Sequence, residues 1–401
     1  MKLAAAALVV FAFGLSPAVA GDLFDACAAV AANRYEPGYE GVGPLDVGGF
    51  SAYDAVEACT PALAEDPSDV RLQAWLGNAY AADGQGAKAL PLLETAAAAG
   101  NVVALRALGD LLIVGKGVPS DKQRGSALLQ QAAGAGFVPA ELSLGYSYDF
   151  GDGVVQDPTS AFKWYLAAAT GGAAKAQLIV ADRYQSGTGV GQSDAEAFKW
   201  IKRAADAADA AGQYWLGVAY LEGRGVKASK AKALEAFRAS SEQSYAPGEN
   251  ALGYMTELGL GLQADANEAY QLYSGAGQTN LPVASYNEAR LRETGSGTDA
   301  DAAAAREVYL KAAGAGETRA AVNLAMMLLS GAGGPVDVAA GVRWTQRAAD
   351  AGNPIAQNNL GRLYEFGLGV TTDPARAREL YTLAADQGYA LAAENLKRLG
   401  N

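Results

Sequence analysis

Two Ser-x-x-Lys spacings, Ser160 with Lys163 and Ser229 with Lys232, are the strongest candidates for nucleophilic catalysis in this sequence. The spacing matches penicillin-interacting enzymes, in which the serine is the nucleophile. The Ser-Asp-Asn and Lys-Thr-Gly elements of those enzymes accompany neither site. The chain also contains no histidine, the commonest general base, so triads that rely on histidine are excluded. We therefore expect no enzyme activity and no catalytic residues.

Acidic residues could bind calcium or hydrolyse glycosides. Asp149, Asp152 and Asp157 surround Gly153, but their spacing lacks the alternating ligands and the closing glutamate of an EF-hand loop. Spacing alone does not exclude a pair of carboxylates for glycoside hydrolysis. Two cysteines without a histidine leave a zinc ion short of ligands. The sequence therefore predicts no metal site and no cofactor.

A glycine-rich run, Gly187-Thr188-Gly189-Val190-Gly191, precedes an expected helix and could cradle a phosphate. The Gly187 and Gly189 pair, however, recurs in steps of 36 residues. A phosphate loop is needed once or twice in a chain, so eight copies in fixed phase indicate a structural role. The other seven pairs are Gly115/Gly117, Gly151/Gly153, Gly223/Gly225, Gly259/Gly261, Gly295/Gly297, Gly331/Gly333 and Gly367/Gly369.

The residues before each glycine pair predict a helix with one small and apolar face. A small residue is followed four positions later by a Leu-Gly pair in most copies, and residues four apart stack on one helical face. The small column contains Ala104, Ala140, Ala176, Gly212, Gly248, Ala284, Ala320 and Ala356. The Leu-Gly pairs include Leu108-Gly109, Leu144-Gly145, Leu216-Gly217, Leu252-Gly253 and Leu360-Gly361.

A column of aspartate and serine after each glycine pair predicts a second helix. These side chains accept hydrogen bonds from the free N–H groups of a helix's first turn. Each repeat is then a helix, a Gly-x-Gly turn and a second helix, and the hairpins bury their apolar faces only by stacking in series. The cap column contains Asp121, Asp157, Ser193, Ser229, Asp265, Asp301, Asp337 and Asp373.

This pattern, almost intact from Ala356 to Gly388, resembles the Sel1-like repeat family, a relative of the tetratricopeptide repeat. The resemblance implies an all-α fold, a right-handed α-solenoid of helix-turn-helix repeats. It covers residues 102–389 as eight 36-residue repeats. Residues 70–101 resemble a shorter, tetratricopeptide-like repeat, and we expect residues 390–401 to form a C-terminal capping helix.

The N-terminus predicts export. Residues 1–20 combine Lys2, an apolar run and Ala18-Val19-Ala20 as a cleavage site, as in a signal peptide. The apolar run is shorter than the roughly 20 residues of a spanning helix, so we expect no direct membrane insertion. The periplasm is the expected location, and full secretion is the alternative.

Both cysteines, Cys27 and Cys59, fall early in the expected mature chain. Export to an oxidising compartment favours a disulfide between them, and a buried pair of free thiols is the alternative. We expect residues 21–69 to form an N-terminal cap that the disulfide pins. The net charge of −12 repels a phosphate backbone, so nucleic acid is not an expected partner.

The resemblance implies a scaffold, adaptor or regulator of a cell-envelope process that binds proteins, such as envelope signalling or polysaccharide-assembly proteins. The alternative is a protein that binds, or weakly hydrolyses, peptidoglycan or another polysaccharide. If the inner face matches that of tetratricopeptide repeats, it is lined by first-helix residues two positions before and after the leucine column. The candidate partner-binding residues there are Tyr146, Asp182, Tyr214, Asn250, Tyr254, Tyr286, Arg290, Asn358 and Arg362.

Overall fold

The computed structural model describes residues 17–39 and 50–400. The expected signal peptide lies outside these residues, except that residues 17–20 belong to the first helix. Across the described ranges the chain forms twenty-one helices and no strand. None of these helices has both the length and the apolar character needed to cross a membrane.

The helices group into two compact units, Met1–Trp200 and Ile201–Asn401, and α10 (Asp194–Asp206) contains the boundary. The first unit has α1 (Pro17–Ala31), α2 (Ala52–Glu65), α3 (Val70–Ala82), α4 (Gly86–Ala98), α5 (Val102–Val114), α6 (Lys122–Gly134), α7 (Val138–Phe150), α8 (Pro158–Thr170) and α9 (Ala174–Ser186). The second has α11 (Ala210–Glu222), α12 (Lys230–Glu242), α13 (Ala246–Leu258), α14 (Ala266–Gln278), α15 (Pro282–Thr294), α16 (Ala302–Gly314), α17 (Thr318–Ser330), α18 (Val338–Asp350), α19 (Pro354–Phe366), α20 (Pro374–Asp386) and α21 (Ala390–Gly400).

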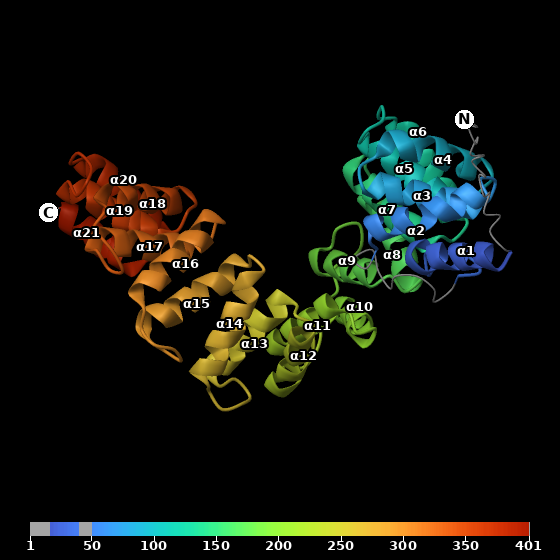
Figure 1. Ribbon diagram of the computed structural model, residues 1–401. Coiled ribbons are helices and arrows are strands. Elements are labelled where there is room, and N and C mark those ends of the chain that lie inside the picture. Colours follow the sequence, from blue (N-terminus) through green and yellow to red (C-terminus); the bar gives the residue numbers. More distant parts are fainter. Residues whose placement is uncertain (1–16, 40–49, 401) are drawn as a thin grey trace, which may run out of the picture. The chain divides into compact units, whose positions relative to one another are not determined.

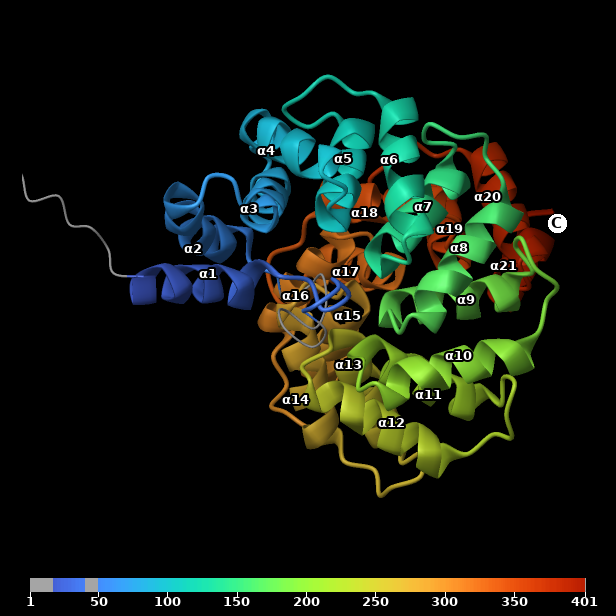
Figure 2. The same cartoon turned by 90° about the vertical axis from the view of Figure 1, so that its right-hand side faces the viewer.

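From α5 onward the odd-numbered helices are the first helices of the repeats, and the even-numbered helices are the second helices. Within each unit, every helix packs against the next one along the chain, so the hairpins follow one another in series (Figures 1 and 2). The final helix, α21, packs against α20 in the place that another first helix would take. Each unit is therefore a stretch of α-solenoid.

The predicted cap column is confirmed at the second helices. In each repeat the aspartate or serine side chain accepts a hydrogen bond from a backbone N–H two or three residues later. Asp373, for example, accepts from the Arg376 N–H at 3.0 Å. These bonds satisfy donors that have no partner inside the helix, and so they define where each second helix begins.

Both glycines of each pair have positive φ, as the turn between the two helices requires. Gly187 ends α9 in the left-handed conformation, and its N–H donates to the Arg183 carbonyl at 2.9 Å. Gly189 lies against the start of α8, where an added Cβ would overlap the Pro158 carbonyl oxygen. The glycine-rich run is thus a structural joint rather than a phosphate cradle.

Four buried tyrosines lie on second helices, and three of them, Tyr165, Tyr273 and Tyr381, fill the space beside a Leu-Gly pair. Tyr165, Tyr273, Tyr309 and Tyr381 are fully buried. A Cβ at Gly361 would lie 2.7 Å from Cε1 of Tyr381, so the glycine lets the ring approach the first helix. The small residues in the first helices therefore set the close spacing within each hairpin.

A disulfide joins Cys27 in α1 to Cys59 in α2, within the expected N-terminal cap. Both cysteines are fully buried. Helix α1 also packs against α3, and α2 packs against α3. The bond therefore joins the two helices that cover the N-terminal end of the repeat array.

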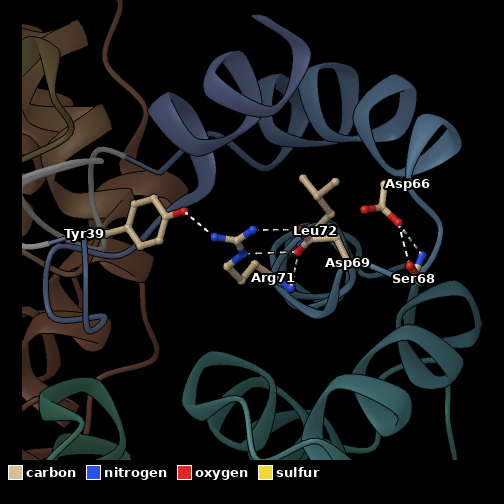
Figure 3. A network of polar contacts seen from close by, with 6 residues as sticks. All are labelled: Tyr39, Asp66, Ser68, Asp69, Arg71 and Leu72. Atoms are coloured by element: carbon tan, nitrogen blue, oxygen red, sulfur yellow. Dashed lines mark hydrogen bonds and ion pairs between the residues drawn. The ribbon is translucent and has the colours of Figure 1, made fainter. Parts of the chain in front are cut away.

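A cluster around Trp75 of α3 anchors the chain that follows α1. The indole N–H donates to Glu36 Oε2 at 2.8 Å, and the rings of Phe24 and Tyr39 pack against the indole. Burial raises the pKa of the Glu36 carboxyl, against the lowering effect of the Trp75 hydrogen bond. Arg71 donates to the Tyr39 hydroxyl at 3.3 Å and pairs with Asp69, the residue that caps α3 (Figure 3).

Candidate partner-binding surface

All nine predicted partner-binding residues lie on first helices, from α7 to α19. The structure divides them into two groups according to what their side chains contact. Six contact other parts of the repeat array, and three are exposed to solvent.

Three of the six engaged residues are tyrosines whose rings are half-buried. Tyr146 packs edge-on against Tyr165 of the second helix in its own hairpin, at a centroid distance of 5.5 Å. Tyr214 lies among the rings of Trp215, Phe237 and Tyr245. Tyr286 packs on Tyr309, and the Arg319 guanidinium of the next repeat lies 4.5 Å from its ring centroid. These rings therefore contribute to packing within the array.

The other three engaged residues join neighbouring first helices through polar contacts. Asn287 donates to Asn250 at 3.0 Å, and Asn395 donates to the buried Asn358 at 2.8 Å. The Arg290 guanidinium forms an ion pair with Glu257, at 2.6 and 2.7 Å to its two carboxylate oxygens. Each of these contacts links one repeat to the next.

Asp182, Tyr254 and Arg362 are the exposed members of the predicted set. The Tyr254 side chain is 48% exposed. Because their side chains are open to solvent, these three residues are the members of the set best placed to contact a partner.

An acid–tyrosine–arginine cluster recurs in the array and was missed by sequence reasoning. At the C-terminal end, the Tyr381 hydroxyl donates to Glu365 at 2.7 Å, and Arg398 of α21 pairs with the same carboxylate. The same arrangement joins Asp149, Tyr165 and Arg183 in the first unit, and Glu257, Tyr273 and Arg290 in the second. The arginine always comes from the following repeat, or from α21, so each cluster joins consecutive repeats within one unit.

The sequence carries a signal for this cluster, because the acid precedes the tyrosine by 16 residues. The fourth buried tyrosine, Tyr309, likewise donates to Glu293 at 2.8 Å. Where Leu129, Ile201, Phe237 or Thr345 replaces the tyrosine, the residue 16 positions earlier is never acidic. Those earlier residues are Ile113, Gln185, Leu221 and Leu329.

Lowering the pH is expected to weaken the attachment of α21 to the preceding repeat, because this attachment includes the Arg398–Glu365 pair. The hydrogen bond from Arg398 holds the pKa of Glu365 below its usual value near 4.5. A carboxyl with a lowered folded-state pKa stabilises the fold above its unfolded pKa, and this stabilisation is lost as pH falls through the folded value. Hydrogen exchange of the α21 amides, corrected for intrinsic rates, should accelerate below about pH 4.

The Arg398→Met variant should show faster exchange in α21 already at pH 7, with a weaker dependence on acid. The control is Arg376→Met, because the pair of Arg376 with Glu379 joins two exposed side chains on α20. Equal α21 protection in wild type and Arg398→Met across the pH range would contradict the role given to this pair.

Exposed apolar side chains gather on the first-helix side of the second unit. Soluble proteins tolerate single exposed apolar residues, so only their clustering on one set of helices is informative. Several second-helix residues, such as Leu310 and Leu383, are also exposed, but fewer of them. The large apolar residues exposed on α11, α13, α17, α19 and α21 are Trp215, Tyr254, Leu258, Met326, Ile355, Phe366 and Leu391.

The serines of the two Ser-x-x-Lys spacings, from which no catalysis is expected, are engaged at helix starts. The Ser160 hydroxyl donates to Asp157 at 2.5 Å, and Ser229 accepts from the Lys232 N–H as the cap of α12. The Lys232 ammonium lies 5.1 Å from the ring centroid of Tyr220. Among the residues that the structure describes, no group of three or more Cys, Asp or Glu side chains could hold a metal ion.

Helical hairpins that repeat every 36 residues and stack in series define an α-solenoid repeat protein. The Sel1 repeat model matches most of the array, and the chain belongs to the Sel1 repeat family. The matched segments are residues 102–137, 138–172, 174–209, 210–245, 246–276, 282–317, 318–353 and 354–389.

Two solved structures of similar proteins support the fold. A Sel1 repeat protein from Oxalobacter formigenes is 28% identical, with a TM-score of 0.61 over 77% of this chain and 90% of that chain. The protein c5321, a protective antigen of uropathogenic Escherichia coli with an SLR fold, is 26% identical. Its TM-score is 0.53, over 87% of this chain and 83% of that chain. No curated protein matches the sequence.

Proposed function

We propose that this protein is a non-enzymatic scaffold that binds other proteins through its first helices. Sel1 and tetratricopeptide-like repeats are typical of such scaffolds. The observation that carries the proposal is the gathering of exposed apolar side chains on first helices, from Trp215 to Leu391. An exposed apolar surface rimmed by polar residues is characteristic of a protein-binding face.

The proposed setting is the cell envelope, with the mature chain in the periplasm. The signal-peptide pattern of residues 1–20 and the disulfide of Cys27 with Cys59 support export to an oxidising compartment. Envelope signalling or polysaccharide-assembly proteins are the proposed partners. The polysaccharide alternative receives less support, because the first-helix carboxylates Glu257 and Glu365 are engaged by arginine and tyrosine.

Capture from an envelope extract tests the proposal. The immobilised mature chain should retain a defined set of proteins, and the Tyr254→Ser, Met326→Ser, Phe366→Ser triple variant should lose most of that set. The control variant, Leu310→Ser with Leu383→Ser, changes exposed apolar residues of second helices and should retain the set. Undiminished retention by the triple variant would show that binding does not use the first helices.

A further inference from the structure

The first-helix side of α17, α19 and α21 forms one continuous surface. Asn359 of α19 lies 3.9 Å from the sulfur of Met326 on α17. On the other side of α19, Arg398 of α21 lies over the ring of Phe366, at 5.5 Å from its centroid. These helices follow one another at the C-terminal end of the chain (Figure 1). Contacts thus run across all three helices.

Helical spacing places further residues on the same surface. Ile355, Asn359, Arg362 and Phe366 follow one another on α19 at intervals of three or four, and such residues share a face. Leu391 precedes Asn395 of α21 by four residues, and Asn395 bonds to α19. We call Met326, Ile355, Asn359, Arg362, Phe366 and Leu391 the C-terminal patch. Its four large apolar side chains are about half exposed.

Arg362 supplies the charge of the patch. It is exposed, and within the described part of the chain no hydrogen bond or ion pair engages its guanidinium, although its charge acts at a distance on Glu365 and Tyr381. The nearest acid on its helix, Glu365, is already bound by Arg398 and Tyr381. The carboxylate of a binding partner could therefore pair with Arg362 through two parallel hydrogen bonds.

The surrounding charge favours an acidic ligand here more than elsewhere on the protein. From residue 318 to the C-terminus the chain holds eight Lys and Arg against seven Asp and Glu, whereas the whole chain holds 31 against 43. The acidic excess therefore lies entirely before residue 318. An acidic segment would meet less repulsion at the C-terminal patch than along the rest of the array.

We propose that the C-terminal patch binds a short partner segment in which one Asp or Glu lies between apolar residues. The carboxylate pairs with Arg362, and the apolar side chains cover Ile355, Phe366 and Met326. From Ile355 to Phe366 the helix spans roughly 16 Å, which matches about five extended residues. The inference rests on the proposed scaffold function and names the chemistry of its ligand.

A random eight-residue peptide library displayed on phage tests this inference. Selection on the mature wild-type protein should enrich peptides with an acidic residue flanked by apolar residues. Selection on Arg362→Glu should replace the acid with Lys or Arg, because the charge of the patch is reversed. Enriched peptides without an acidic residue, or the same peptides on both proteins, would overturn the inference.

Fluorescence anisotropy with the most enriched peptide gives the second readout. Binding to Arg362→Glu should weaken at least tenfold, and binding to Arg343→Glu, an exposed arginine on the second helix α18, should not change. If no peptide is enriched while the envelope extract still supplies first-helix partners, the inference fails and the scaffold function stands. If no peptide is enriched and the envelope extract supplies no first-helix partner, the proposed scaffold function fails as well.

Discussion

Replacing Gly189 with alanine is expected to destabilise the first unit far more than the same change at Gly187, two residues earlier in one turn. Both glycines have nearly the same left-handed φ, 76° at Gly187 and 75° at Gly189. A Cβ at Gly187 meets nothing closer than 3.5 Å. The expected cost there is the left-handed conformation alone, about 1–2 kcal/mol.

At Gly189 the added Cβ also strikes backbone. It would overlap the carbonyl oxygen of Pro158 and lie 2.6 Å from the carbonyl carbon. Backbone at the first position of α8 cannot rotate aside as a side chain can, so the turn and α8 must separate. We expect a total cost of about 2–5 kcal/mol, the conformational cost plus that of overpacking.

Urea unfolding distinguishes the two variants when it is monitored through the hydrogen exchange of the α8 and α9 amides. The unfolding midpoint should fall clearly in Gly189→Ala and only slightly in Gly187→Ala. Similar midpoints for the two variants would mean that the close approach of the turn to α8 does not limit stability. A similar pair in the second unit is Gly331→Ala and Gly333→Ala. A Cβ at Gly333 would overlap the Ala302 carbonyl, whereas a Cβ at Gly331 would meet only the Val336 side chain closely, at 2.9 Å.

Removal of the disulfide is expected to release the N-terminal cap. The Cys27→Ala, Cys59→Ala variant loses a cross-link between residues 32 positions apart, and both side chains are buried. For a loop of that length the loop-entropy estimate is about 3–4 kcal/mol. Alanine is chosen because it leaves no unpaired polar atom at these buried positions.

The loss should be local, because repeat arrays unfold in parts rather than as one body. Hydrogen exchange should accelerate in α1 and α2 of the variant and remain unchanged in α13 to α20. Reduction of the wild-type protein should give the same pattern. Unchanged protection of α1 and α2 in both experiments would show that packing alone holds the cap in place.

The repeat positions could be predicted from the sequence because each follows from one local rule. A left-handed turn needs glycine, a helix start favours Asp or Ser, and close helix packing needs small residues. Such rules act the same way in every repeat. The columns therefore predict the turns, the caps of the second helices and the buried small residues.

The polar contacts between repeats could not be predicted in the same way. Arg290 and Arg362 occupy the same position in their first helices, yet Arg290 pairs with Glu257 and Arg362 is exposed. Likewise, Asn358 is buried because Asn395 lies opposite it. Whether such a residue faces a neighbour or the solvent depends on the residue that the adjacent repeat supplies, and the repeat pattern alone does not specify that residue.

Site-specific photo-crosslinking tests the central claim, that partners bind along the first helices, most directly. A benzoylphenylalanine replaces Tyr254 or Phe366 on first helices, and Leu310 or Leu383 on second helices, because all four side chains are about half exposed. Irradiation in envelope extract should give discrete protein adducts from Tyr254 and Phe366 and none from Leu310 and Leu383. Adducts from the second-helix positions alone would contradict the account.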